Sequence, residues 1–306
     1  MLHALASCMT SPRQVLPGTV YLVTRRCSQR QLLLKPSAET NNVFRYVLAV
    51  AARRFGVRLH AFCVLSNHVH LIVTDPEARL PAFAQYLGSL VARALNASLG
   101  RWESFWAPSS YSAVALLSPG DIVEKTAYVL ANPVAAGLVR RGREWPGLWS
   151  DPEVLDTGAL PVPRPSSFFR PDGPMPDRAY LELVTPPGFG SAAEFREAVT
   201  LALAARELDA SRVRAASGQT VAGVEMVLAQ KATSRPHATE ARRQMRPRVA
   251  GRDPWKRVAA LARLADFLRA YRQALAELRR GAPDVLFPAG TYWQRVVCGV
   301  RCAAPV

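Results

Sequence analysis

Apolar and polar positions follow two different rhythms along the first half of the chain. Residues 18–24 form a short β-rich run, whereas residues 41–55 place apolar side chains on one helical face and end before Gly56. Two apolar, β-branched runs follow, residues 57–65 and 69–74, and the short polar break between them is typical of a hairpin. The pattern therefore predicts a strand, a helix and two paired strands, in that order.

The same rhythms continue beyond the hairpin. Residues 80–99 predict a second amphipathic helix, which ends at Gly100. Residues 111–117 predict a further strand, and residues 119–130 predict a third helix that is closed by an Asn-Pro pair. The first six elements match the split β-α-β, or ferredoxin-like, arrangement, in which helices pack on one face of an antiparallel sheet. We therefore predict an α+β fold.

The second half of the chain has a different composition. Proline and glycine crowd into residues 152–175, which indicates a linker or an extended arm. Three helical patterns follow, at residues 191–208, 220–231 and 255–280. The chain is thus interpreted as a domain at 14–151, a Pro-rich linker at 152–175 and a mostly helical, basic extension at 176–306.

Charge gives the first indication of a partner. The chain has a formal net charge of +16, and a strongly basic surface favours polyanions, of which nucleic acid is the commonest for a soluble protein. Acidic membranes are the other candidate, but no run approaches the roughly 18 consecutive apolar residues of a membrane-spanning helix. The densest basic stretch, residues 242–248, is either a segment that contacts phosphates or a solvated surface.

The cysteines indicate a reducing environment. The five cysteines are scattered, their number is odd, and none forms a Cys-x-x-Cys pair. This is poor material for a framework of disulfides. We therefore expect reduced and mostly buried thiols in a cytoplasmic protein.

The sharpest local feature is the sequence His68-Val69-His70. In a strand, residues i and i+2 point to the same face, so both imidazoles project together while Val69 points into the core. Two neighbouring imidazoles form part of a site for a divalent metal. By itself this is a weak signal, because a His-x-His pair is often only a surface or hydrogen-bonded pair. His60, in the preceding strand, is interpreted as structural.

A second feature lies in the third predicted helix. Tyr128 and Asn132 are four residues apart, so they share one face of that helix. A helical tyrosine is usually a half-buried packing residue, and the alternative is a nucleophile. A phenol has a reference pKa of about 10, so it attacks a phosphodiester at neutral pH only when it is deprotonated or when a metal activates the phosphate.

Together these residues carry a resemblance to a known family. Residues 60–73 resemble the strand with the HUH motif of the REP-associated tyrosine transposases, within the wider insertion sequence 200-like class. Residues 127–139 are similar to the nucleophile helix of that family and to its Asn-Pro-Val segment. Residues 16–26 and 145–150 are also family-like, so the resemblance covers roughly residues 14–151.

The resemblance implies a mechanism. His68 and His70 would hold Mg2+ or Mn2+, and Asn132 matches the position of a third ligand. Tyr128 would attack a phosphodiester of single-stranded DNA, forming a 5′-phosphotyrosine and freeing a 3′-hydroxyl. Since that bond conserves the energy for rejoining, no nucleotide cofactor is expected, and the sequence has no Gly-rich Walker loop.

The resemblance also implies a partner, single-stranded or hairpin DNA. Several arginines are candidates for neutralising its phosphates: Arg25, Arg26, Arg30, Arg53, Arg54, Arg58, Arg242 and Arg243. Four aromatic residues are candidates either for stacking on unpaired bases or for ordinary core packing: Trp102, Phe105, Trp106 and Tyr111. Because some relatives supply the tyrosine from a second subunit, a monomer and a homodimer both remain open.

Two departures from the family pattern favour a second hypothesis. Ser110 stands where relatives often have a basic residue, and Ala135-Ala136 stand where they commonly have an arginine. The alternative function is therefore a domesticated, non-catalytic protein that binds repeat or hairpin DNA through the same fold. A third interpretation, an unrelated metal-dependent hydrolase, lacks acidic ligands, since the nearest carboxylate is Asp75.

Overall fold

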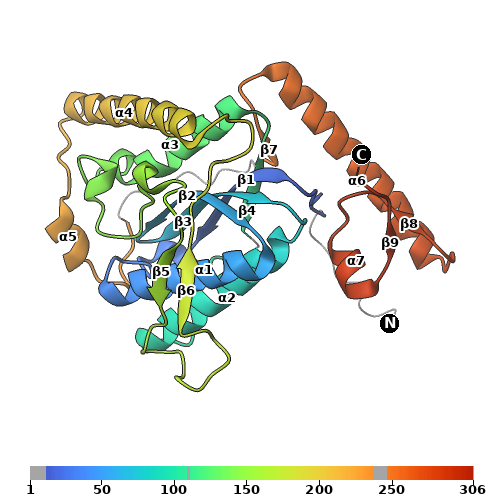
Figure 1. Ribbon diagram of the computed structural model, residues 1–306, viewed down its shortest axis with the longest axis horizontal. Helices are drawn as coiled ribbons and strands as arrows, with labels where there is room; N and C mark the ends of the chain where they lie inside the picture. The colour runs from blue at the N-terminus through green and yellow to red at the C-terminus, as the bar shows by residue number, and fades with distance from the viewer. Residues whose placement is uncertain (1–11, 109–110, 237–246, 306) are drawn as a thin grey trace.

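A five-stranded sheet forms the centre of the computed structural model, which describes residues 12–108, 111–236 and 247–305 (Figure 1). Its strand order is β2-β3-β1-β4-β7. All neighbouring strands are antiparallel except β4 and β7, which are parallel. The strands are β1 (Thr19–Arg26), β2 (Arg58–Leu65), β3 (His68–Asp75), β4 (Ser112–Leu116) and β7 (Val249–Ala250).

Helices cover both faces of this sheet (Figure 1). On one face lie α1 (Ala38–Phe55) and α2 (Leu80–Ser98), as the ferredoxin-like arrangement of the first six elements requires. The opposite face carries α3 (Pro119–Ala135), and α4 (Ala192–Ala216) lies along α3. The predicted α+β class is therefore confirmed. The seventh element, α3, covers the face of the sheet that a single layer of helices would leave open.

The alternation of β3 explains the two helix layers. Val69 and Leu71 point toward α1 and α2, where they line a small cavity together with Phe44 and Phe83. His70 points the other way, and its ring contacts α3. Because successive strand residues face opposite sides, one strand supplies the core on one face and the candidate chemistry on the other.

Capping residues fix the ends of the helices that carry this arrangement. The hydroxyls of Ser37 and Ser118 accept hydrogen bonds from the first turns of α1 and α3. α1 ends at Gly56, which adopts the left-handed conformation that glycine tolerates. α3 continues through Pro133 to Ala135, beyond the end predicted from the sequence.

External donors stabilise that extended end of α3. The indole of Trp149 donates to the carbonyl of Leu130 over 2.9 Å, and the Arg214 guanidinium donates to the carbonyl of Val134 over 2.5 Å. The bond to Val134 satisfies a carbonyl that the last turn of a helix leaves without a partner. The helix therefore ends against other parts of the chain and not in solvent.

The Pro-rich segment is an extended arm that packs on α1. It contains the short helix η4 (Pro152–Val154) and the strand β5 (Leu160–Pro163), which pairs antiparallel with β6 (Arg178–Leu181). Both strands lie against α1. The arm buries Leu155, Val162 and Phe169 in the same hydrophobic core as the sheet.

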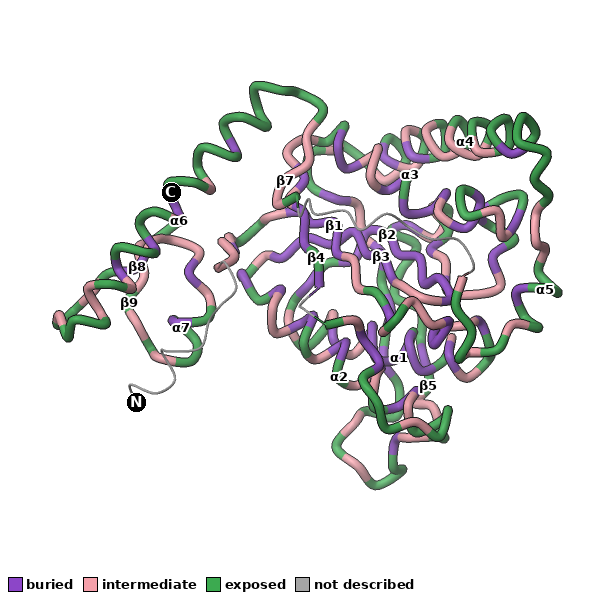
Figure 2. Tube along the Cα trace, turned by 180° about the vertical axis from the view of Figure 1, so that it is seen from behind, coloured by how far each residue is buried: buried purple, intermediate pink, exposed green. Residues whose placement is uncertain are grey.

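The rest of the chain is mostly helical. α5 (Val224–Ala229) is shorter than predicted, whereas α6 (Pro254–Arg279) matches its predicted span closely. α6 leads away from the sheet and is largely exposed (Figure 2). The final elements are β8 (Leu286–Phe287), α7 (Trp293–Cys298) and β9 (Arg301–Cys302). A second, smaller core joins them to α6 through Phe267, Tyr271, Ala274 and Phe287.

Two expectations about the whole chain can be compared with the described residues. None of the helices in the described ranges is long and apolar enough to cross a membrane. Within the same ranges the four cysteines Cys27, Cys63, Cys298 and Cys302 are free thiols, and the first two are buried. The fifth, Cys8, lies outside the described residues.

Candidate active site

β3 brings the two predicted histidines together. The rings of His68 and His70 lie on one face of the strand, with 4.8 Å between their centroids and an interplanar angle of 88°. His68 is half-buried and His70 is buried. The i, i+2 spacing therefore places both imidazoles on one face of the sheet, as the sequence predicts.

The neighbouring strand orients His70. In the β1–β3 register Thr24 stands opposite His70, and the Thr24 hydroxyl lies 2.8 Å from Nδ1 of the imidazole. Burial, followed by the charges of His68 and Arg26, holds the pKa of His70 well below its usual value of 6.5. His70 is therefore a neutral imidazole at physiological pH, the form that binds metals.

An asparagine orients His68. Nδ1 of His68 lies 2.6 Å from Oδ1 of Asn67, whose amide nitrogen donates to the carbonyl of Arg30 over 3.4 Å. That second bond fixes which end of the Asn67 amide faces the imidazole. Since an amide oxygen only accepts, Nδ1 of His68 carries the proton, and the lone pair of the ring belongs to Nε2. Metal-binding histidines are commonly held in this way through their other nitrogen.

Tyr128 of α3 contacts one member of this pair, His70. Its ring meets the ring of His70 edge-on, with centroids 5.6 Å apart and an interplanar angle of 74°. The side chain is 38% exposed, so its surface is accessible to a ligand. Two cations flank it: Nζ of Lys125 and Cζ of Arg206 each lie 5.8 Å from its ring centroid. The predicted nucleophile and the predicted metal ligands therefore meet within one chain.

The donor set for a metal is small. Asn132 lies one helical turn beyond Tyr128 in α3 and is half-buried, so its share in the site follows from helical spacing. In the part of the chain that the structure describes, no group of three or more His, Cys, Asp or Glu side chains is placed to hold a metal. The role of Asn132 as a third ligand therefore stays a prediction from the sequence.

Part of the chain that carries this geometry is similar to a known protein family. Residues 19–125 match the family model described as "Transposase IS200 like". This part of the chain is similar to the IS200-like transposases. The match includes both histidines and ends shortly before Tyr128, so the predicted nucleophile and the second half of the chain lie outside it.

Solved structures and curated proteins add little to the family assignment. A REP-associated tyrosine transposase bound to a REP hairpin is 20% identical, with 46% of this chain and 81% of that one covered and a TM-score of 0.39. A candidate transposase from Deinococcus radiodurans R1 is 21% identical, with 35% and 85% covered and a TM-score of 0.27. No curated protein matches the chain.

Two of the predicted DNA-contacting arginines lie at the end of the sheet that carries His68. Arg26 stands opposite His68 in the β1–β3 register and is exposed. Arg30 follows in the short helix η2 (Ser28–Arg30), and its carbonyl accepts the bond from Asn67. Both positions are compatible with phosphate contacts next to the site.

The other predicted arginines lie elsewhere. Arg25 points to the opposite face of the sheet, where its guanidinium packs over Trp106 and donates to a carbonyl of α2; burial lowers its pKa. Arg53, Arg54 and Arg58 lie at the far end, because Arg58 pairs with Thr74 at the opposite end of β3 from His68, about 20 Å away along the strand. Arg242 and Arg243 fall outside the described residues, as does Ser110.

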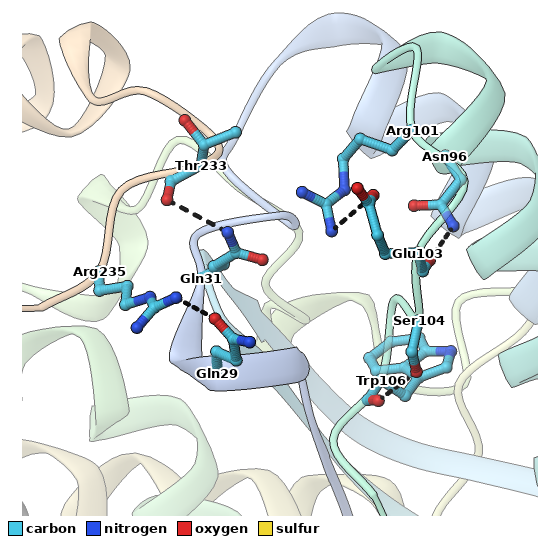
Figure 3. Close-up of polar contacts among 9 residues, drawn as sticks. All are labelled: Gln29, Gln31, Asn96, Arg101, Glu103, Ser104, Trp106, Thr233 and Arg235. Atoms are coloured by element: carbon cyan, nitrogen blue, oxygen red, sulfur yellow. Dashed lines mark hydrogen bonds and ion pairs between the residues drawn. The ribbon is translucent and has the colours of Figure 1, made fainter.

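The predicted stacking residues divide into two groups. Phe105, Trp106 and Tyr111 are buried and serve the core, whereas Trp102 is 94% exposed. Hydrogen bonds and an ion pair hold the loop that carries Trp102 (Figure 3). Its end runs beside β1, since the amide of Ala107 donates to the carbonyl of Arg26 over 2.9 Å. Trp102 is therefore a fully exposed aromatic side chain on a loop whose end runs beside the histidine end of β1.

Asp75 does not belong to the site. Its carboxylate accepts hydrogen bonds from the amides of Arg79 and Leu80 over 2.8 and 2.7 Å, so it caps the start of α2. It also lies at the end of β3 that is remote from His68. The hydrolase interpretation thus gains no carboxylate ligand from this residue.

Sequence reasoning missed several residues that shape the site. Asn67 is the sequence neighbour of His68, but its role in orienting His68 depends on the direction of its side chain, which the sequence does not show. Thr24 required the exact strand register. Lys125 required the face of α3, and Arg206 comes from α4, far along the chain and outside the family match, so the sequence holds no local signal for it.

Proposed function

We propose that this chain cleaves and rejoins single-stranded or hairpin DNA through a 5′-phosphotyrosine formed on Tyr128, with a divalent metal bound at His68 and His70. The observation that carries the proposal is the edge-on contact between the rings of Tyr128 and His70. It brings a surface-accessible phenol and a pair of oriented imidazoles together from two distant parts of one chain. The family match over residues 19–125 supports a DNA-processing role.

The residues present fit a metal. Nε2 of His68 and of His70 would be ligands, because Asn67 and Thr24 engage the Nδ1 atoms. The amide oxygen of Asn132 would be a third ligand. When bound, Mg2+ or Mn2+ polarises the scissile phosphate and stabilises the charge that develops on it. Since imidazole suits transition metals better than Mg2+, we expect Mn2+ to support the higher activity.

The chain itself supplies the nucleophile. The oxygen of Tyr128 forms a bond to the phosphorus as the bond to the 3′-oxygen of the preceding nucleotide breaks. The phenol proton passes to water, and the departing 3′-oxygen takes up a proton to become a hydroxyl. Rejoining reverses these steps with a 3′-hydroxyl as the nucleophile, so the phosphate remains in an ester throughout and no nucleotide cofactor is consumed.

The proposed partner is a DNA hairpin with an unpaired flank. Arg26 and Arg30 lie at the site, and the basic character of the whole chain favours a polyanion. A relative of similar fold class has been solved with a REP hairpin bound to it. The second candidate is a hairpin-binding protein without catalysis, which the exposed Ala135 and Ala136 favour because they place no cation after α3.

One experiment separates the two candidates. The protein is incubated with labelled single-stranded hairpin DNA and Mn2+ or Mg2+, and the products are resolved under denaturing conditions. We expect a covalent protein–DNA adduct that is absent with Tyr128→Phe and strongly reduced with His70→Ala. Hairpin binding without any adduct would support the non-catalytic candidate, and an equal adduct with Tyr128→Phe would exclude the mechanism.

A further inference from the structure

Helix α4 lies against the nucleophile helix although it belongs to the half of the chain outside the family match (Figure 1). It is attached near both of its ends. Near its start, Phe195 and Val199 are buried in the core, and near its end Arg214 donates to the carbonyl of Val134 in the last turn of α3. Side chains between these points are therefore held in fixed positions relative to α3.

One of these side chains is Arg206. Its guanidinium forms an ion pair with Glu124 of α3, and its Cζ lies 5.8 Å from the ring centroid of Tyr128. The side chain is 33% exposed, and its Nε is a buried donor without a hydrogen-bond partner among the described residues. Leaving such a donor unsatisfied costs free energy. An ordinary surface ion pair therefore does not account for the burial of the Arg206 Nε atom.

The geometry of α3 links the two contacts of Arg206. Glu124 precedes Tyr128 by four residues, so both side chains lie on the same face of the helix, one turn apart. The carboxylate thus holds the guanidinium at the height of the tyrosine ring. His70 meets the same ring from the sheet, so Tyr128 is contacted from both α4 and β3.

A second arginine provides a comparison. Arg252 also forms an ion pair with Glu124, and its amide donates to the carboxylate of Asp121 over 2.8 Å. Its side chain is 72% exposed, more than twice as exposed as that of Arg206. The two arginines therefore share the carboxylate, whereas the contact with Tyr128 belongs to Arg206.

We propose that Arg206 is a positioning residue for Tyr128: Glu124 holds its guanidinium, which keeps the phenol ring against His70 and places a positive charge beside the phosphate that the phenol acquires. This rests on the proposed function of Tyr128. A guanidinium near an aromatic face is attracted to it, and the attraction grows when solvent is excluded. The role of the helix α4 would thus be to complete the nucleophile site.

The test compares Arg206→Ala with Arg252→Ala. Each variant removes one ion-pair partner of Glu124 and one positive charge. The two variants therefore affect the contact of Glu124 with the second half of the chain, and the long-range attraction of DNA, to a similar extent. The rate of adduct formation at saturating hairpin DNA with Mn2+ is measured beside hairpin affinity and the unfolding temperature. We expect Arg206→Ala to lower the saturated rate about tenfold and Arg252→Ala to change it less than about twofold. Arg206→Lys should recover part of the loss.

A second readout does not depend on catalysis. In protein with 13C-labelled tyrosine, the ring resonances of Tyr128, assigned with Tyr128→Phe, should shift in Arg206→Ala and remain nearly unchanged in Arg252→Ala. Equal rates and equal spectra for the two alanine variants would overturn the positioning role, as would a loss of rate that only follows a loss of stability. Absence of any adduct with the wild-type protein is a different result: it refutes the proposed function, and the positioning role in catalysis with it.

Discussion

The hydroxyl of Thr24 offers the most direct test of how the histidine pair is built. Substitution Thr24→Val keeps the shape of the side chain and removes the group that lies 2.8 Å from Nδ1 of His70. The residue is half-buried in the centre of β1, and valine is as favourable in a strand as threonine. The change therefore removes one hydrogen bond while it keeps the volume and the strand preference of the side chain.

The expected magnitude follows from the role of that bond. If Nε2 of His70 binds a metal, Nδ1 carries the proton and donates it to Thr24 Oγ1. Loss of such an outer partner typically lowers metal affinity about 10- to 100-fold, and tenfold corresponds to about 1.4 kcal/mol. The buried Nδ1–H would also lose its acceptor, which costs about 1–3 kcal/mol in a buried environment. Both effects weaken Mn2+ binding, and the second also lowers stability.

The assay is calorimetric titration of the protein with Mn2+, accompanied by thermal unfolding of both forms. Thr19→Val is the matched control, because Thr19 lies on the same strand and donates to the carbonyl of Leu16 at the end remote from His70. We expect weaker Mn2+ binding for Thr24→Val and unchanged binding for the control. Equal affinities in Thr24→Val and wild type would refute the assignment of Thr24 as the residue that orients His70.

Three further predictions concern the fold, the subunit arrangement and the DNA contact. Burial lowers the pKa of His60 to about 4, so between about pH 6.5 and 4 the unfolded state binds a proton that the folded state does not; the unfolding temperature should fall with pH in that window, less so in His60→Asn. Because Tyr128 meets His70 within one chain, mixing Tyr128→Phe with His70→Ala should not restore the adduct, and restored adduct would demonstrate action across a dimer. Trp102→Ala should leave the unfolding temperature unchanged and weaken binding of hairpins with an unpaired flank about tenfold or more, relative to Trp255→Ala, another exposed tryptophan; equal affinities would argue against stacking on Trp102.

The alternation of apolar residues allowed the sheet domain to be predicted closely. Strand and helix periods differ, so the order β1-α1-β2-β3-α2-β4-α3 could be derived from the sequence, and the i, i+2 rule placed His68 and His70 on one face. The same rule, applied to β1 with its register, separates Arg26 from Arg25. That register depends on the pairing of distant strands. From the sequence alone, both arginines were therefore equal candidates for contacting DNA phosphates.

The remaining features depend on contacts between distant segments. A helical pattern shows that α4 has a core-facing side but does not show which surface it covers, so Arg206 could not be connected with Tyr128. Likewise, proline and glycine indicated a linker or an extended arm, but its packing on α1 arises from a few apolar side chains such as Phe169, which the composition does not single out. Aromatic residues were ambiguous for the same reason, and only burial distinguishes Trp102 from Trp106.

The short strand β7 has a consequence for how this chain can be divided. Val249 and Ala250 pair in parallel with Ala115 and Leu116, so the second half of the chain covers the outer edge of a sheet formed otherwise by the first half. A fragment that ends near residue 151 would expose the hydrogen-bonding groups of β4 and the outer surface of α3. Uncovered strand edges promote association with other chains. The fragment should therefore aggregate where the full chain does not, because the second half of the chain covers an edge that the first half leaves open.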